Sequence, residues 1–226
     1  TIHIQEGAMA RNKYPEETKK LIVDTAARLF MEKGYDHTSI QDIIDNLGGL
    51  TKGAIYHHFK SKEDIVYAVF EKMYAQADID TKKVCESKNM NGFQKLQEVF
   101  RLSIFNPAQN DVLVVAIDMI KNPQLLVIYL RDMVQTESTE MVRRILEEGI
   151  EDGSIKTEYP KELAEVLMLL GGIWINPMVY PCDSSEIVKK VRFYQHMLEA
   201  LGLNIIEDSW IDQIESYAAL YQENQK

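Results

Sequence analysis

Apolar residues recur at helical spacing along nearly the whole chain, and the first such stripe follows Pro15. It ends at Lys33-Gly34, where a cation in the last turn and a following glycine are typical of a helix end. Proline suits the first turn of a helix, because its missing N–H has no intrahelical partner there. The pattern predicts a helix over 15–33 whose buried face is Leu21, Ile22, Ala26, Leu29 and Phe30.

Two short helices and a longer one are predicted next. Thr38, with Gln41 three residues later, favours a capping box at the start of the first, and Gly48-Gly49 ends it. Thr51 opens the second short helix, and Ser61 caps a helix over about 62–80. The apolar positions expected to face inward are Ile40, Ile43, Ile44, Leu47, Ala54, Ile55 and Phe59.

The rest of the chain is also predicted to be helical. Only the valine-rich run 112–117 has a pattern that a buried strand could share. A helix is favoured there because no second strand signal exists to pair with it. The other helices are expected at 93–105, from Pro123 to about 152, at 160–179, at 185–201 and at 208–223. The predicted fold class is therefore all-α.

A polar stretch at 82–92 interrupts the helical pattern and indicates a joint between two parts. We expect a head over 10–62, a linking helix over about 62–80, and a helical domain over 81–226. Residues 1–8 precede Met9 and show no periodicity, so the fold prediction leaves them out.

Charge is distributed unevenly between these parts. The net charge of −10, taken alone, argues against binding nucleic acid. Residues 10–62, however, hold nine Lys and Arg against seven Asp and Glu, whereas residues 63–226 carry a net charge of −11. A mildly basic head on an acidic body fits local contact with DNA, with the body held away from it.

Two short helices joined by a glycine-containing turn, behind a longer helix, have the arrangement of a helix-turn-helix. The second short helix would enter the major groove of DNA. Thr51 and Lys52 lie at its N-terminus, where backbone N–H groups attract phosphate, and Gly53 allows the backbone to approach closely. The candidate DNA-contacting residues are Thr38, Thr51, Lys52, Gly53, Tyr56, His57 and Lys62.

Two stretches of this head, TSIQDII at 38–44 and GLTKGAIYHHFKSKE at 49–63, resemble the N-terminal signature of the TetR family of bacterial transcriptional regulators. The preceding AARLF at 26–30 and KGY at 33–35 are similar to that family's first helix. One departure is Gly48, where the family more often has alanine. The resemblance implies an all-helical homodimer that binds a palindromic operator, as a repressor released by a small ligand.

The chain carries little other recognisable chemistry. His57-His58 invites a metal site, but adjacent helical residues point in different directions and no Cys or acid follows at ligand spacing. Cys85 and Cys182 are too few for a disulfide framework or a closed zinc site. We therefore expect no metal and no cofactor.

The C-terminal part lacks a phosphate-binding loop, a nucleophile elbow and a paired-carboxylate pattern, which argues against an enzyme and leaves no catalytic residue to name. Two alternatives stay open. One is an enzyme or small-molecule carrier with the head as a structural cap. The other is an adaptor whose outer helix face meets an acidic protein, which competition by duplex DNA would distinguish.

Aromatic and methionine residues of the C-terminal part could line a cavity for an apolar or amphipathic effector, although such sets are more often plain core. The candidate pocket residues are Phe100, Phe105, Met119, Tyr129, Met133, Trp174 and Met178. Effector binding there would shift the linking helix and change the separation of the two recognition helices, about 34–36 Å on DNA.

The helix at 160–179 is apolar nearly all round, and 185–201 carries a second apolar stripe. Such helices are shared between subunits or lie deep in a core, so they predict a homodimer interface. No signal peptide and no run of 18 apolar residues is present, which predicts a cytoplasmic protein without a membrane partner.

Overall fold

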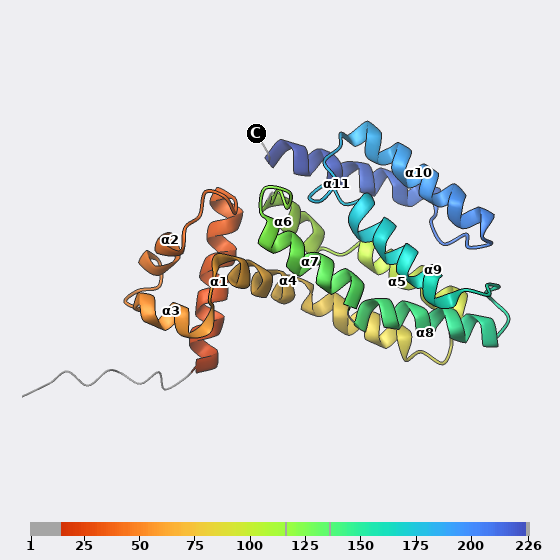
Figure 1. Ribbon diagram of the computed structural model, residues 1–226, viewed down its shortest axis with the longest axis horizontal. Helices are drawn as coiled ribbons and strands as arrows, with labels where there is room; N and C mark the ends of the chain where they lie inside the picture. The colour runs from red at the N-terminus through yellow and green to blue at the C-terminus, as the bar shows by residue number, and fades with distance from the viewer. Residues whose placement is uncertain (1–14, 116, 136, 225–226) are drawn as a thin grey trace, which may run out of the picture.

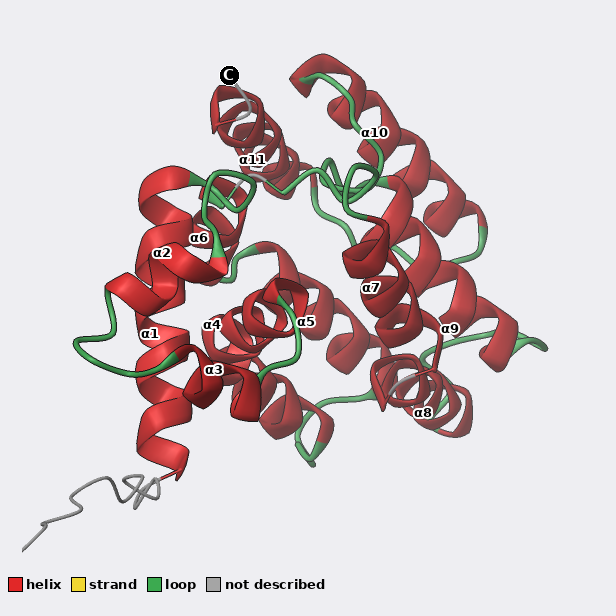
Figure 2. Cartoon of the chain, turned by 60° about the vertical axis from the view of Figure 1, so that its left-hand side comes forward, coloured by secondary structure: helices red, strands yellow, loops and turns green. Residues whose placement is uncertain are grey.

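The computed structural model describes residues 15–115, 117–135 and 137–224, with the side chains of 132–137 outside that description. Within these ranges every regular element is a helix (Figure 1, Figure 2), which confirms the predicted all-α fold class.

Three helices form the head, and a fourth leads out of it. These are α1 (Pro15–Lys33), α2 (Ile40–Asp45), α3 (Lys52–His58) and α4 (Lys62–Cys85). In Figure 1, α4 runs from the head into the body. The side chains of Thr51 and Ser61 accept hydrogen bonds from backbone N–H groups of α3 and α4, which confirms the predicted cap at Ser61 and the predicted start of a helix near Thr51.

The start of α2 corrects the predicted capping box. Ser39, not Thr38, is the N-cap: its hydroxyl accepts from Asp42 N at 3.1 Å, and the Asp42 carboxylate accepts from Ser39 N at 2.8 Å. Two adjacent hydroxyl residues carry the same capping signal in the sequence. Packing against α1 decides which of them turns inward.

The body consists of the remaining helices. They are α5 (Gly92–Ile104), α6 (Ala108–Val114), α7 (Pro123–Gln135), α8 (Glu137–Glu151), α9 (Pro160–Leu169), the π turn η1 (Leu170–Trp174), α10 (Ser184–Ala200), the 3₁₀ turn η2 (Asp208–Trp210) and α11 (Ile211–Asn224). Helix α8 packs between α5 and α9, and α11 packs on both α10 and α6.

The predicted helix at 112–117 is correct only as far as Val114, and Ile117 is neither helix nor strand. The Val115 carbonyl accepts from Tyr35 N at 3.3 Å, and the Ile117 carbonyl accepts from the Tyr221 hydroxyl at 2.9 Å. Hydrogen bonds from Tyr35 and Tyr221 thus occupy two carbonyl oxygens that would accept backbone N–H groups if the helix continued.

Two long predicted helices are each divided. The helix expected over 123–152 is α7 and α8, on either side of Thr136, which lies outside the described residues. The helix expected over 160–179 is α9 followed by η1. Gly171 and Gly172 lie within η1, which is a single π turn.

Two hydrophobic cores hold the molecule together. The first joins head to body, because Ile22 and Ile55 of the head share it with Val112, Met119 and Met178 of the body. The second lies within the body, among α5, α8, α9, α10 and α11. The head is therefore not an isolated unit, since part of the body completes its core.

Candidate nucleic-acid interface

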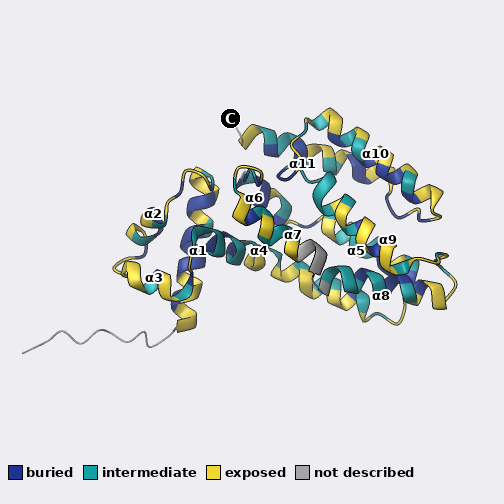
Figure 3. Ribbon diagram, viewed as in Figure 1, coloured by how far each residue is buried: buried dark blue, intermediate teal, exposed yellow. Residues whose placement is uncertain are grey.

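Helix α3 turns one face to the core and the other to solvent. Ile55 and Phe59 are buried, whereas Lys52, Tyr56 and His57 are exposed. Figure 3 shows exposed stretches along α3. Apolar residues thus anchor α3 inward, and polar residues on its other face are exposed to solvent. Five of the candidate DNA-contacting residues share this exposed surface, namely Thr51, Lys52, Gly53, Tyr56 and His57.

Contacts within this surface orient its side chains without covering them. Lys52 Nζ lies 5.7 Å from the centre of the Tyr56 ring, and the His57 ring meets the His58 ring edge-on at 5.3 Å between centroids. A Cβ on Gly53 would meet only Thr51 Oγ1, at an ordinary 3.8 Å. The fold does not require glycine at position 53, which is consistent with close approach of a second molecule there.

Thr38 does not belong to this surface. Thr38 is 1% exposed. Its hydroxyl proton is shared between the carbonyl oxygens of Gly34, at 2.9 Å, and Leu29, at 3.3 Å. From that position the side chain braces the α1–α2 turn and does not face DNA. This geometry argues against the predicted role of Thr38 as a DNA contact.

Lys62 is also directed inward. Its half-buried ammonium donates to the carbonyls of Tyr35 at 2.9 Å and Thr38 at 3.1 Å, and it lies 3.9 Å from the centre of the Tyr35 ring. Burial lowers the pKa of Lys62. These contacts tie the start of α4 to the α1–α2 turn, and they favour a structural role over the predicted phosphate contact.

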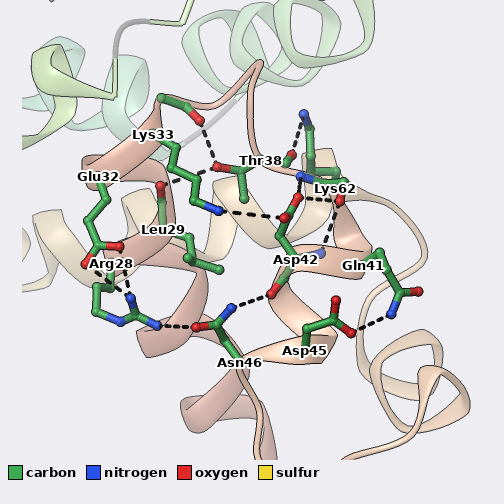
Figure 4. A network of polar contacts seen from close by, with 12 residues as sticks. Arg28, Leu29, Glu32, Lys33, Thr38, Gln41, Asp42, Asp45, Asn46 and Lys62 are labelled. Carbon is green, nitrogen blue, oxygen red and sulfur yellow. Dashed lines mark hydrogen bonds and ion pairs between the residues drawn. The ribbon is translucent and has the colours of Figure 1, made fainter.

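A polar network on the outer side of α1 and α2 fixes the angle between them (Figure 4). Arg28 donates to Glu32 and to Asn46 Oδ1, each at 3.0 Å, and Lys33 pairs with Asp42 at 3.7 Å. Each exposed contact contributes little alone. Together they hold the end of α2 against α1 and so position the turn before α3. The two contacts between the helices, Arg28 to Asn46 and Lys33 to Asp42, join residues too far apart in sequence to form a local motif, so sequence reasoning missed them.

The candidate pocket residues do not line one common space. Met119 and Met178 are buried in the first core, whereas Phe100 and Trp174 pack against the second. Tyr129 packs on the first core and donates its hydroxyl proton to the Gly172 carbonyl in η1 at 2.6 Å. The predicted set is thus divided between two cores.

Two other candidates lie elsewhere. Phe105 is 38% exposed and meets Trp210 edge-on at 6.1 Å, so it is not a wall of an interior pocket. The side chain of Met133 lies outside the described residues. A surface groove of about 650 Å³ borders Asp118, Cys182 and the end of α11, and none of the seven candidates lines it.

The segment 115–122 links body and head directly, and the sequence did not predict this connection. At one end the Val115 carbonyl accepts from Tyr35 N at 3.3 Å. At the other, Asn122 Nδ2 donates to Asp36 Oδ1 at 3.3 Å. Because Tyr35 and Asp36 both lie in the α1–α2 turn, the helix-turn-helix is held at its base by the body.

A short helix with an exposed polar face, anchored through a tight turn to a half-buried partner helix and backed by a helical body, defines a helix-turn-helix DNA-binding protein. Residues 22–69 match the sequence model of the family described as bacterial regulatory proteins, tetR family. The head therefore carries the DNA-binding region described by this family model, and the chain is a DNA-binding transcriptional regulator.

The relatives agree with this assignment. The HTH-type transcriptional repressor AcnR of Corynebacterium glutamicum is 25% identical over 163 residues, which are 71% of this chain and 81% of that protein. The HTH-type transcriptional regulator AcrR of Shigella flexneri is 43% identical over 65 residues, 28% of this chain and 30% of that protein.

The fold is shared with a solved structure. A crystal structure of a transcriptional regulator from Cytophaga hutchinsonii aligns with a TM-score of 0.55 at 18% identity, covering 90% of this chain and 96% of that one. Across the described residues, no helix is both long enough and apolar enough to cross a membrane.

Proposed function

We propose that this protein is a repressor whose homodimer places one α3 from each subunit in successive major grooves of a palindromic operator, in the cytoplasm where that DNA lies. The exposed polar face of α3 carries the proposal, because the opposite face is anchored by Ile55 and Phe59. In this proposal, residues 10–62 bind DNA and α4 connects them to the body. Residues 81–226 bind the effector and form the dimer.

The proposed dimer interface is formed by α9 and α10, within the predicted ranges 160–179 and 185–201. Three large apolar side chains on these helices, and a fourth just past the end of α10, stay exposed. They are Val166, Leu169, Phe193 and Leu201, with 40%, 41%, 58% and 53% of their surface exposed. A second copy of the chain would cover them.

Release from DNA would use two connections between body and head. Lys72 of α4 pairs with Asp24 of α1 at 2.6 Å. In the segment 115–122, Met119 N donates to the Met178 carbonyl at 3.0 Å, just beyond η1. An effector that prefers the arrangement of the body in which the heads do not bind DNA would shift the head through these contacts. An effector with equal affinity for both arrangements would shift neither.

The test is selection of bound duplexes from a random pool at low and moderate salt. Enrichment of a two-fold-symmetric site supports the proposal. An enriched site without symmetry contradicts the homodimer, and no enrichment at either salt contradicts DNA reading and favours the adaptor alternative. The relatives' description as transcriptional repressors supports the first outcome.

A further inference from the structure

The surface groove of about 650 Å³ at the end of α11 is formed by three segments that are distant in the chain. Asp118 comes from the segment 115–122, Cys182 from the loop before α10, and Glu223 from the last turn of α11. In Figure 1 this end of α11 lies beside the mark for the C-terminus. Clefts that bind small molecules enclose about 300–1,000 Å³, so the groove is large enough for one.

Hydrogen bonds between the three segments hold the walls of the groove in place. The Tyr221 hydroxyl donates to the Ile117 carbonyl at 2.9 Å, which fixes α11 to the segment 115–122. Gln222 Nε2 donates to the Cys182 carbonyl at 3.1 Å, which fixes α11 to the loop before α10. The walls are thus tied together without a ligand, and a ligand would not lose affinity by having to order them.

Every charged group that lines the groove is a carboxylate. These are Asp118 and Glu223, and no Lys, Arg or His of the described residues lines it. Burial raises the pKa of the Cys182 thiol, so the thiol stays neutral at physiological pH. The groove also lies at the C-terminal end of α11, where the helix dipole and the last carbonyl groups favour a cation. Side chains and helix end thus both favour a positively charged occupant.

Neighbouring lysines compensate only part of this negative charge. Lys121 pairs with Asp118 at 3.1 Å, but its side chain is 72% exposed, and an exposed pair of this kind is weak. Lys190 of α10 donates to the Trp174 carbonyl at 3.1 Å. Glu223 is exposed and forms no ion pair within the part of the chain that the structure describes. Glu223 is therefore the carboxylate that an incoming cation would pair with.

We propose that this groove binds a small organic cation, an amine that carries an apolar group. Its ammonium pairs with Glu223, and its apolar part lies against Pro181 and Ala219. The occupant would touch the segment 115–122, which is bonded to the head through Asn122. The inference goes beyond the proposed function and does not depend on it, because binding of the amine can be measured without DNA.

The experiment measures binding of benzylamine, benzyl alcohol and benzoate to the full chain by ligand-observed NMR titration at pH 7 and low salt. The three probes share an aromatic ring and differ in charge. We expect benzylamine, which is a cation at this pH, to bind more tightly than the alcohol, and the alcohol to bind more tightly than the benzoate anion. Added salt should weaken benzylamine binding, because it screens an exposed ion pair.

Two variants of α11 distinguish the groove from the general attraction of an acidic chain for amines. Glu223→Gln keeps the shape of the side chain and removes its charge, so it should lower benzylamine affinity roughly two- to fivefold, the range for an exposed ion pair. Binding of benzyl alcohol should not change. Glu215→Gln is the matched control, because Glu215 is also exposed on α11 and does not line the groove. Thermal melting checks that each variant is folded.

Equal binding of benzylamine and benzyl alcohol, tighter binding of benzoate, absence of benzylamine binding, or an equal effect of Glu223→Gln and Glu215→Gln would each overturn the inference. Operator selection without any amine tests the proposed function separately. A chain that selects a symmetric operator but binds no benzylamine would keep its regulatory role and lose this site.

Discussion

Single residues of the head divide into those that hold the helix-turn-helix in shape and those that face outward. The side chains of Thr38 and Lys62 donate hydrogen bonds to carbonyls of the α1–α2 turn, although both residue types commonly contact phosphate. Lys52 and His57 on α3 stay exposed. What a polar residue of the head does therefore depends on the direction of its side chain.

Replacement of Lys52 by alanine should weaken binding to all duplexes alike, because a lysine at a helix N-terminus contacts phosphate and carries no base information. The slope of log K against log salt concentration should become less steep by about one. Filter binding across a salt series measures this. Lys88→Ala, an exposed lysine in the loop before α5, is the matched control. An unchanged slope in Lys52→Ala would remove Lys52 from phosphate contact.

Gly53→Ala should separate folding from DNA binding. A Cβ at this position meets nothing closer than 3.8 Å, and alanine favours a helix over glycine by up to about 1 kcal/mol, so the variant should be as stable as the parent or more stable. Operator affinity should nevertheless fall, because the added methyl group lies where the duplex approaches. Urea unfolding measures the stability of the variant, and operator titration measures its affinity for DNA. Parent-like operator affinity would exclude close approach at residue 53.

At the scale of elements, the α1–α2 turn is where most of the supporting contacts meet. Lys62 reaches it from α4, Thr38 closes it from within, and Asn122 reaches it from the body. Helix α2 has only six residues, too few to be stable alone, so its orientation depends on these contacts and on the Arg28 network.

Thr38→Val tests the bracing role of this turn. Valine keeps the volume and removes the hydroxyl, so the carbonyls of Gly34 and Leu29 lose the proton that they share, which should cost about 1–2 kcal/mol of unfolding free energy. Because Thr38 does not face DNA, the slope of log K against log salt should stay at the parental value. Denaturant unfolding and salt titrations measure both quantities. A reduced slope with unchanged stability would restore Thr38 as a DNA contact.

At the scale of the whole molecule, the first core makes head and body a single mechanical unit, whereas the exposed apolar faces of α9 and α10 point to a second copy. Phe193→Asp should therefore give a monomer in sedimentation experiments and lower affinity for a symmetric operator by on the order of 100-fold or more, because each head would then bind its half-site independently. Ile79→Asp, at a residue 51% exposed on α4, is the control. Dimers that persist in Phe193→Asp would place the interface elsewhere.

Local patterns were enough to determine the all-α fold, the start of α3 near Thr51 and the cap at Ser61. They also predict α3 as the helix that reads DNA. Apolar periodicity, hydroxyl caps and glycine stops each depend on residues that are close together in the chain. The sequence alone is therefore enough to predict the structure that they produce.

Tertiary structure alone decided which hydroxyl caps α2, where Lys62 points, and how the predicted pocket residues divide between two cores. It also ended α6 at Val114, widened residues 170–174 into a π turn, and bonded the Tyr129 hydroxyl to the Gly172 carbonyl. Each of these outcomes depends on a partner distant in the chain, Tyr35 for Val115 and Gly172 for Tyr129, and the free energy of such a contact exists only after the helices have packed.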